Sequence, residues 1–195
     1  VARGRRRGVL QLILQVHVAD CAAGEAIRRD GPLMVYDATA NTAAYHPDGV
    51  GAATSDGRHV VWSLVAEAAD DALLAAPVAF DDARLMRCDR VDFPADGVAF
   101  LHTHQGPGIR VQVLGDFAVE TEGHRQEIDT WGAWFEGGPE PVYAEVRGAA
   151  PAAFVRVMLL PVAIQGSPSI RYVRDEDRDR PKSQSYTVFV DEPLP

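Results

Sequence analysis

The chain has few cysteines and no long apolar run. Only Cys21 and Cys88 occur among the 195 residues, and neither lies in a CxxC pair or beside a histidine at the spacing of metal ligands. These facts exclude a disulfide framework, and we expect both thiols to be small buried apolar groups. No stretch reaches the roughly 18 consecutive apolar residues that a membrane-spanning helix needs, so no membrane partner is expected.

An excess of positive charge is also absent. Lys and Arg number 19 against 28 Asp and Glu, which gives a net charge of −9. Nucleic-acid binding requires a basic face, so we expect no nucleic-acid partner. The sequence contains no GxSxG, P-loop or GxGxxG motif, which removes the enzyme classes built on those turns. With 47% apolar and 24% charged residues, the composition is that of a globular protein.

The N-terminal segment has the layout of an export signal, because four arginines within the first seven residues precede an apolar run. Gln11, Gln15 and His17 interrupt that run, and Asp20 lies where small residues should flank a cleavage point. We therefore expect this segment to be an amphipathic helix or a frayed extension. The protein is then expected to be cytoplasmic.

Short segments with strand character alternate with turns along most of the chain. The 17 Gly and 13 Pro are spread throughout, as is typical of many turns and short strands. Residues 30–57 are the exception and predict a loop-rich arm, and the Ala-rich residues 66–76 predict a short helix or a hairpin. The predicted strands are 33–36, 59–65, 83–89, 98–102, 110–114, 117–120, 125–128, 143–147, 153–160 and 185–190. This spacing indicates an all-β sandwich or barrel.

One window carries a recognisable motif. His102 and His104 are followed by Gly108 and then by Gly115. This pattern resembles the first motif of the cupin superfamily, which has an HxH pair, a Glu and a later Gly. Residues 131–141, rich in Gly and Pro, resemble the second cupin motif. The resemblance implies a single jelly-roll β-barrel and, commonly, a homodimer.

The resemblance also sets the expected organisation of the chain. The cupin-like barrel spans residues 58–162. Residues 1–57 form an N-terminal arm, and residues 163–195 form a C-terminal tail whose last strand returns to a sheet edge, because an unpaired apolar strand would expose that edge.

In cupins two His, a Glu and a last His bind a divalent metal such as Fe, Zn, Mn or Ni. Residues two apart in a strand face the same side, so His102 and His104 both point into the predicted barrel. At the family spacing, however, the Glu position is Gly108 and the last His position is Val142, neither of which coordinates a metal. His102 and His104 are thus the metal residues of an incomplete site, and no cofactor is certain.

Three roles stay open for His102 and His104. They can be hydrogen-bonding or acid–base groups of a metal-free pocket, metal ligands completed by an unexpected side chain, or structural groups. Glu136, Glu140 or His124 could complete a metal site, although no spacing rule brings any of them to the pocket.

Arg110 and Gln112 face the same side as the histidines if the alternation continues through Gly108. A buried guanidinium is costly unless an anion accompanies it. The protein could supply that anion from Asp116 or Glu120. Alternatively, Arg110 binds a ligand carboxylate bidentately while Gln112 orients it.

The predicted function is binding of a small, carboxylate-bearing molecule in the barrel, at His102, His104, Arg110 and Gln112. Two alternatives stay open: a metal-dependent cupin enzyme of the dioxygenase or isomerase type that uses His102 and His104 as ligands, or a non-catalytic dimerisation module. Whether the protein is an enzyme is left open, and no catalytic residue is assigned, because this fold hosts many unrelated functions.

Overall fold

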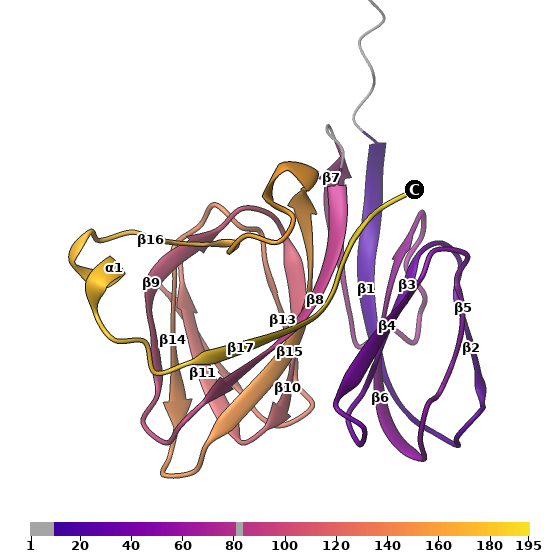
Figure 1. The fold of residues 1–195 in the computed structure, drawn as a ribbon, viewed down its shortest axis with the longest axis horizontal. Helices are drawn as coiled ribbons and strands as arrows, with labels where there is room; N and C mark the ends of the chain where they lie inside the picture. Colours follow the sequence, from indigo (N-terminus) through magenta and orange to yellow (C-terminus); the bar gives the residue numbers. More distant parts are fainter. Residues whose placement is uncertain (1–9, 81–83) are drawn as a thin grey trace, which may run out of the picture.

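The structure is a computed structural model that describes residues 10–80 and 84–195, and nearly all of it is antiparallel β-structure (Figure 1). The prediction of an all-β fold is confirmed. The strands are, in chain order, β1 (Leu10–Cys21), β2 (Ala26–Arg28), β3 (Leu33–Asp37), β4 (Thr42–His46), β5 (Val50–Ala52), β6 (Gly57–Val65), β7 (Leu74–Phe80), β8 (Arg84–Phe93), β9 (Val98–His104), β10 (Gly108–Leu114), β11 (Asp116–Thr121), β12 (His124–Ile128), β13 (Ala133–Glu136), β14 (Val142–Arg147), β15 (Ala152–Pro161), β16 (Ile170–Tyr172) and β17 (Ser185–Pro193). The described helices are a 3-10 turn, η1 (Val162–Ile164), and the one-turn α1 (Glu176–Asp179).

Three five-stranded sheets form the body of the protein. The N-terminal sheet has the order β4-β3-β6-β1-β7, the middle sheet β13-β10-β15-β8-β17, and the outer sheet β12-β11-β14-β9-β16. A separate two-stranded sheet of β2 and β5 lies beside the N-terminal sheet (Figure 1). The middle and outer sheets enclose one apolar cluster, and the N-terminal sheet packs on the other face of the middle sheet.

The middle sheet is therefore buried on both faces. In β10, Ile109 and Val111 pack against the N-terminal sheet, where they join a cluster that contains Trp62. Residues between them, such as Arg110, face the outer sheet. In β15 every residue except the last is buried, which explains its nearly continuous apolar sequence. The Trp62 indole Nε1 donates a hydrogen bond of 3.2 Å to the Ile109 carbonyl oxygen and thereby joins the two sheets directly.

Several expectations for the N-terminal part are wrong. The segment expected to be an amphipathic helix or an extension is β1, whose polar residues are paired within the sheet: the Gln15 side chain donates a hydrogen bond of 3.0 Å to the Ser63 hydroxyl. Residues 30–57 contain β3, β4 and β5 rather than a loop with one strand. In the Ala-rich segment a turn leads into β7, and β7 pairs with β1 rather than forming a hairpin with β6. The arginines of the export-signal pattern lie outside the described residues.

The predicted strands between residues 98 and 160 occur at or near their expected positions as β9 to β12, β14 and β15. Their arrangement differs from the single barrel, because the middle and outer sheets face each other without closing. In addition, β6, which the expected division groups with the barrel, pairs with β1 and β3 in the N-terminal sheet. The strands β13 and β16 are not among those predicted, since each is very short.

The C-terminal segment links the edges of the two facing sheets. β16 pairs with β9 at the edge of the outer sheet, and β17 pairs with β8 at the edge of the middle sheet (Figure 1). Between them, Lys182 Nζ donates hydrogen bonds to the carbonyl oxygens of Asp177, Arg178 and Arg180, which fastens the turn around α1. Among the described residues, no helix has the length and apolar character needed to cross a membrane.

The contact between the N-terminal and middle sheets can be tested at Trp62. Replacing it with Phe (Trp62→Phe) keeps an aromatic ring but removes the indole hydrogen bond to Ile109 and leaves a small void. We expect the free energy of unfolding to fall by about 1–2 kcal/mol in urea titrations. Trp131→Phe is the control, because Trp131 is half-buried, packs at the border of the same cluster and over Arg58, and makes no indole hydrogen bond in the described part of the chain. Equal effects of the two substitutions would contradict the proposed importance of the sheet contact.

Candidate functional site

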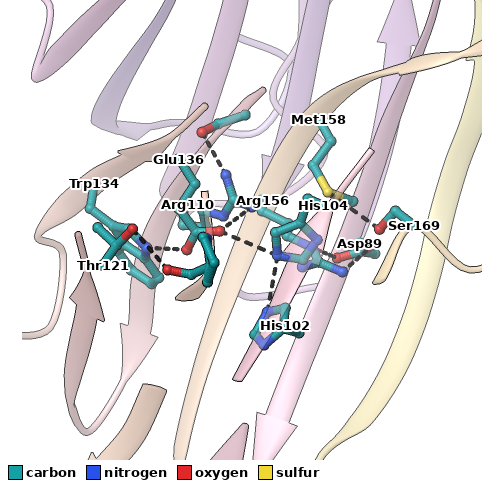
Figure 2. A network of polar contacts seen from close by, with 12 residues as sticks. Asp89, His102, His104, Arg110, Thr121, Trp134, Glu136, Arg156, Met158 and Ser169 are labelled. Carbon is teal, nitrogen blue, oxygen red and sulfur yellow. Dashed lines mark hydrogen bonds and ion pairs between the residues drawn. The ribbon is translucent and has the colours of Figure 1, made fainter. Parts of the chain in front are cut away.

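The two motif histidines lie on the inner side of the outer sheet, close to its β16 edge. Both are buried, and their rings meet edge to face with His102 Nε2 3.2 Å from His104 Nε2 (Figure 2). They come together because alternate residues of β9 face the same side. The structure therefore brings these two predicted site residues into one cluster.

The hydrogen bonds around the histidines assign their tautomers. His102 Nδ1 lies 2.7 Å from the Phe100 carbonyl oxygen, which can only accept, so Nδ1 carries the hydrogen and Nε2 keeps its lone pair. His104 Nε2 lies 3.2 Å from His102 Nε2 and 3.2 Å from Glu136 Oε2. Because both neighbours are acceptors, His104 Nε2 carries a hydrogen. His104 Nδ1 is buried and has no hydrogen-bond partner in the described part of the chain.

A carboxylate that spacing rules do not find completes this cluster. Glu136 lies on β13, which pairs with β10 so that Glu136 stands opposite Gly108. A carboxylate thus reaches the imidazoles from the strand that neighbours Gly108, and not from residue 108 itself. Glu136 Oε1 accepts a hydrogen bond of 2.8 Å from Trp134 Nε1, and Oε2 faces His104. Only the pairing of β13 with β10 reveals this position.

Arg110 is inside the protein, as the alternation suggested, but its partner is Glu136. The Arg110 side chain is 0% exposed, its NH2 lies 2.6 Å from Glu136 Oε2, and its NH1 donates a hydrogen bond of 2.6 Å to the Gly108 carbonyl oxygen. The expected partners Asp116 and Glu120 are exposed on β11. Since the protein itself supplies the carboxylate, Arg110 is not available to bind a ligand bidentately.

Gln112 is also fully buried, but the structure does not bring it to the histidines. Its Nε2 donates a hydrogen bond of 2.8 Å to the Leu114 carbonyl oxygen at the far end of β10. Neither Gln112 nor Arg110 lines the cavity that borders His102 and His104.

Gly108 allows close packing rather than opening space beside the histidines. A Cβ atom on Gly108 would lie 2.4 Å from the Val157 carbonyl oxygen and 2.9 Å from Met158 Cγ, both on the adjacent strand β15. A side chain of any size would therefore push β10 away from β15.

A second buried ion pair lies beside the first. Arg156 stands opposite Arg110 in the pairing of β15 with β10, and opposite Asp89 in the pairing of β15 with β8. Arg156 Nε donates a hydrogen bond of 2.6 Å to Asp89 Oδ1, and Arg156 NH2 donates one of 3.2 Å to Asp89 Oδ2 (Figure 2). Two guanidinium groups and two carboxylates thus balance each other's charge inside the sandwich.

Burial and these neighbours determine the charge of each group. Burial lowers the pKa of His104 to about 3 and also lowers the pKa of His102. Burial alone would raise the pKa of Glu136, but Arg110 and the contact with His104 hold it well below its usual range. Burial lowers the pKa of Arg110 to about 10, which still leaves it charged near neutral pH. The cluster therefore holds two neutral imidazoles beside two ion pairs.

The cluster does not fit a divalent metal. Within the described residues no three His, Cys, Asp or Glu side chains are arranged to hold an ion. The oxygen of Glu136 that faces the imidazoles lies 2.6 Å from a guanidinium, whose positive charge opposes a second cation there. Val142 stands opposite His102 on β14 and adds no ligand. The structure does not bring Glu140 to the pair, and His124 is exposed on β12.

Two spaces border Arg156, and a further space of about 290 Å³ borders Glu136 and Val142 instead. The inner cavity, bordered by His102, His104 and Glu136, has a volume of about 20 Å³, enough for a water molecule or two. A cleft of about 540 Å³ opens between the sheet edges formed by β16 and β17. The cleft is lined by Arg87, Asp89, Arg156, Gly166, Ser167, Pro168, Ser169, Ile170, Tyr172, Tyr186, Val188 and Asp191. Only this second space has the volume of an ordinary small-molecule site.

Comparison with known proteins adds one weak structural likeness. No protein family and no curated protein matches the sequence. Among solved structures, the crystal structure of AerE from Microcystis aeruginosa is similar, with 11% sequence identity over 76% of this chain and 88% of that chain, and a TM-score of 0.43. A likeness at that level carries no argument about activity.

The burial of His104 makes a prediction about pH. The unfolded chain takes up a proton near the ordinary value of 6.5, whereas folded His104 does so near 3, so stability falls as the pH drops from 6.5 towards 3. For this one residue the loss between about pH 7 and about pH 5 is about 2 kcal/mol. The free energy of unfolding, measured in urea at both pH values, should therefore fall less in His104→Gln than in the wild type, by about that amount. His124→Gln, a change of an exposed residue, should leave the decrease as in the wild type; an unchanged decrease in His104→Gln would contradict the buried neutral imidazole.

The close packing at Gly108 makes a second prediction. Gly108→Ala should reduce the free energy of unfolding by about 1–3 kcal/mol, because the new Cβ meets backbone that cannot move aside easily. Gly137→Ala is the matched control, since its Cβ would meet only the flexible carboxylate of Glu140, at 2.8 Å. Urea unfolding measures both, and a neutral Gly108→Ala would show that the site has spare room after all.

Proposed function

We propose that this is a cupin-like protein that binds a small molecule at the open edge of its two-sheet sandwich, with a carboxylate of the ligand at Arg156. The observation that carries the proposal is the cleft of about 540 Å³ between β16 and β17, which ends at the buried ion pair of Arg156 and Asp89. The HxH motif and the jelly-roll-like pair of facing sheets support the cupin-like assignment.

The size of the two spaces favours the cleft over the inner cavity. A volume of about 20 Å³ beside the histidines admits water but no organic ligand, whereas small-molecule sites usually measure about 300–1,000 Å³. We therefore propose that the predicted ligand binds in the cleft between β16 and β17, and not in the cavity beside the histidines.

The lining of the cleft favours an amphipathic ligand. Ile170, Tyr172 and Val188 present apolar surface from β16 and β17, so they suit an aromatic or aliphatic body. Of the two cleft arginines, Arg87 is fully engaged, because it bonds Asp191 and the carbonyl oxygens of Ser167 and Ile164.

Arg156 is the better anchor for an anion. It contacts Asp89 through Nε and NH2, and within the described residues its NH1 makes no hydrogen bond. A ligand carboxylate at NH1 would gain a charge-assisted hydrogen bond in a place where little water competes. Arg156 thus takes the role that the sequence suggested for Arg110.

Nothing in the structure favours the metal-dependent enzyme of the dioxygenase or isomerase type. Such an enzyme would need His102, His104 and a free carboxylate, and Glu136 is already paired with Arg110. The retained histidines are better explained as neutral hydrogen-bonding groups beside that ion pair.

The proposal is tested with phenylacetate and two probes that replace its carboxylate, 2-phenylethanol and phenethylammonium. We expect phenylacetate to bind about tenfold more tightly than 2-phenylethanol, and phenethylammonium to bind least, as measured by NMR shift titration. Equal affinity for acid and alcohol would contradict a carboxylate site.

Matched substitutions locate the binding. Val188 lines the cleft and is 54% exposed, and Val173 lies outside it with a similar exposure of 48%. Val188→Asp places a negative charge in the cleft, so it should weaken phenylacetate binding about fivefold or more, whereas Val173→Asp should have little effect. A loss that is the same in both variants would place the ligand elsewhere.

A further inference from the structure

Two spaces, a cleft and a buried cavity, meet at a pair of side chains. Of the residues that line them, Arg156 and Tyr186 are common to both. On the cleft side lie β16 and β17, and on the cavity side lie His102, His104 and Glu136. Tyr172 also lines the cleft, with its ring centre 6.5 Å from that of His102, but it does not border the cavity. The boundary that the cleft and the cavity share therefore consists of Arg156 and Tyr186.

Of these two, Arg156 belongs to the fixed framework. It is buried, lies in the middle of β15, and makes two hydrogen bonds to Asp89. The Asp89 and Arg156 charges stabilise each other, so moving the guanidinium would leave a buried carboxylate alone.

Tyr186 is held much less firmly. It lies on β17, an edge strand that pairs only with β8 and has an irregular register between Val188 and Val190. Its hydroxyl accepts a hydrogen bond of 3.0 Å from Gln184, and its ring lies near Arg156, with 5.8 Å between the ring centre and Arg156 Cζ. The side chain is 43% exposed. Its ring is therefore the removable part of the partition.

The opposite end of the cavity is closed by aromatic packing. The ring centres of Phe93 and Phe117 are 4.9 Å apart, those of Phe117 and Phe154 are 5.5 Å apart, and those of Trp134 and Phe154 are 5.2 Å apart. Such a packed cluster closes this end of the cavity. A further space, of about 290 Å³, borders Glu136 and Val142 but neither histidine.

We propose that the ring of Tyr186 is the partition between the ligand cleft and the buried imidazole–carboxylate cavity, and that it determines how deep a ligand can reach. Tyr186 is thus a specificity-determining residue: with the ring present, ligands end at Arg156, and without it they extend to His102. The statement about ligands depends on the proposed function, whereas the statement about the partition does not.

The partition is tested without any ligand by diethyl pyrocarbonate, which acylates accessible neutral imidazoles. In the wild type we expect exposed His124 to react fast, and His102, His104 and the fully buried His59 to be protected, as followed by peptide mass spectrometry. Tyr186→Ala should raise the reaction rate of His102 or His104 about tenfold or more.

Two further variants keep this test decisive. Tyr186→Phe retains the ring and should protect the histidines as the wild type does. His59 lies in the N-terminal sheet and reports unfolding, so its protection shows that a variant is folded; if it reacts in Tyr186→Ala, then Tyr186→Val, which suits a strand better, gives the answer. Continued protection of His102 and His104 in a folded variant without the ring overturns the proposal, as does equal opening in Tyr186→Phe.

The consequence for ligands is tested by chain length. We expect the ratio of the dissociation constants of 6-phenylhexanoate and phenylacetate to change about tenfold in favour of the longer acid in Tyr186→Ala, because its methylene groups can fill the space that the tyrosine ring leaves beside Arg156. An unchanged ratio overturns the role in specificity. Failure of phenylacetate to bind the wild type would instead refute the proposed function, while the diethyl pyrocarbonate experiment would still decide on the partition.

Discussion

The ion pair of Arg110 and Glu136 is the interaction on which the rest of the site depends. Glu136 neutralises a guanidinium that has no access to water, and the same carboxylate accepts from Trp134 and faces His104. Because the charges are already balanced, the imidazoles stay neutral and a metal cation has no free carboxylate to bind. In the proposed function the ligand carboxylate therefore binds at Arg156 instead of Arg110. Charge balance thus explains why the two histidines are neutral and why the site does not fit a metal ion.

Much of the sandwich could be predicted from local patterns, and so could β3 and β6, but the other strands of the N-terminal third could not. Alternation and turn residues locate β9 to β12, β14 and β15, since both signals are local. In β1 the polar Gln15 and His17 hide the strand pattern, because their partners Ser63 and Asp71 lie far along the chain. In the sequence, a buried polar residue whose partner lies far along the chain looks the same as a polar residue that ends a strand.

The same limit applies within the site. The inward direction of His102 and His104 follows from the alternation of a strand, but the identity of their carboxylate neighbour follows from the pairing of β13 with β10. Nothing in the spacing separates Glu136 from Glu140. Arg156 and Asp89 were equally hidden, since their contact spans β8 and β15 and nothing in the sequence of β8 separates Asp89 from the other charged residues of that strand.

The C-terminal tail, which carries β16 and β17, is separate in sequence from the strands that carry the charged cluster. Its two strands contribute the flanking walls of the cleft, while the charged cluster belongs to strands that precede it in the chain. The turn between the walls is fastened by the ammonium group of Lys182. Under the proposed function, substitutions in this one terminal stretch change ligand preference while the buried ion pairs of the preceding strands are untouched, so recognition and folding vary almost independently.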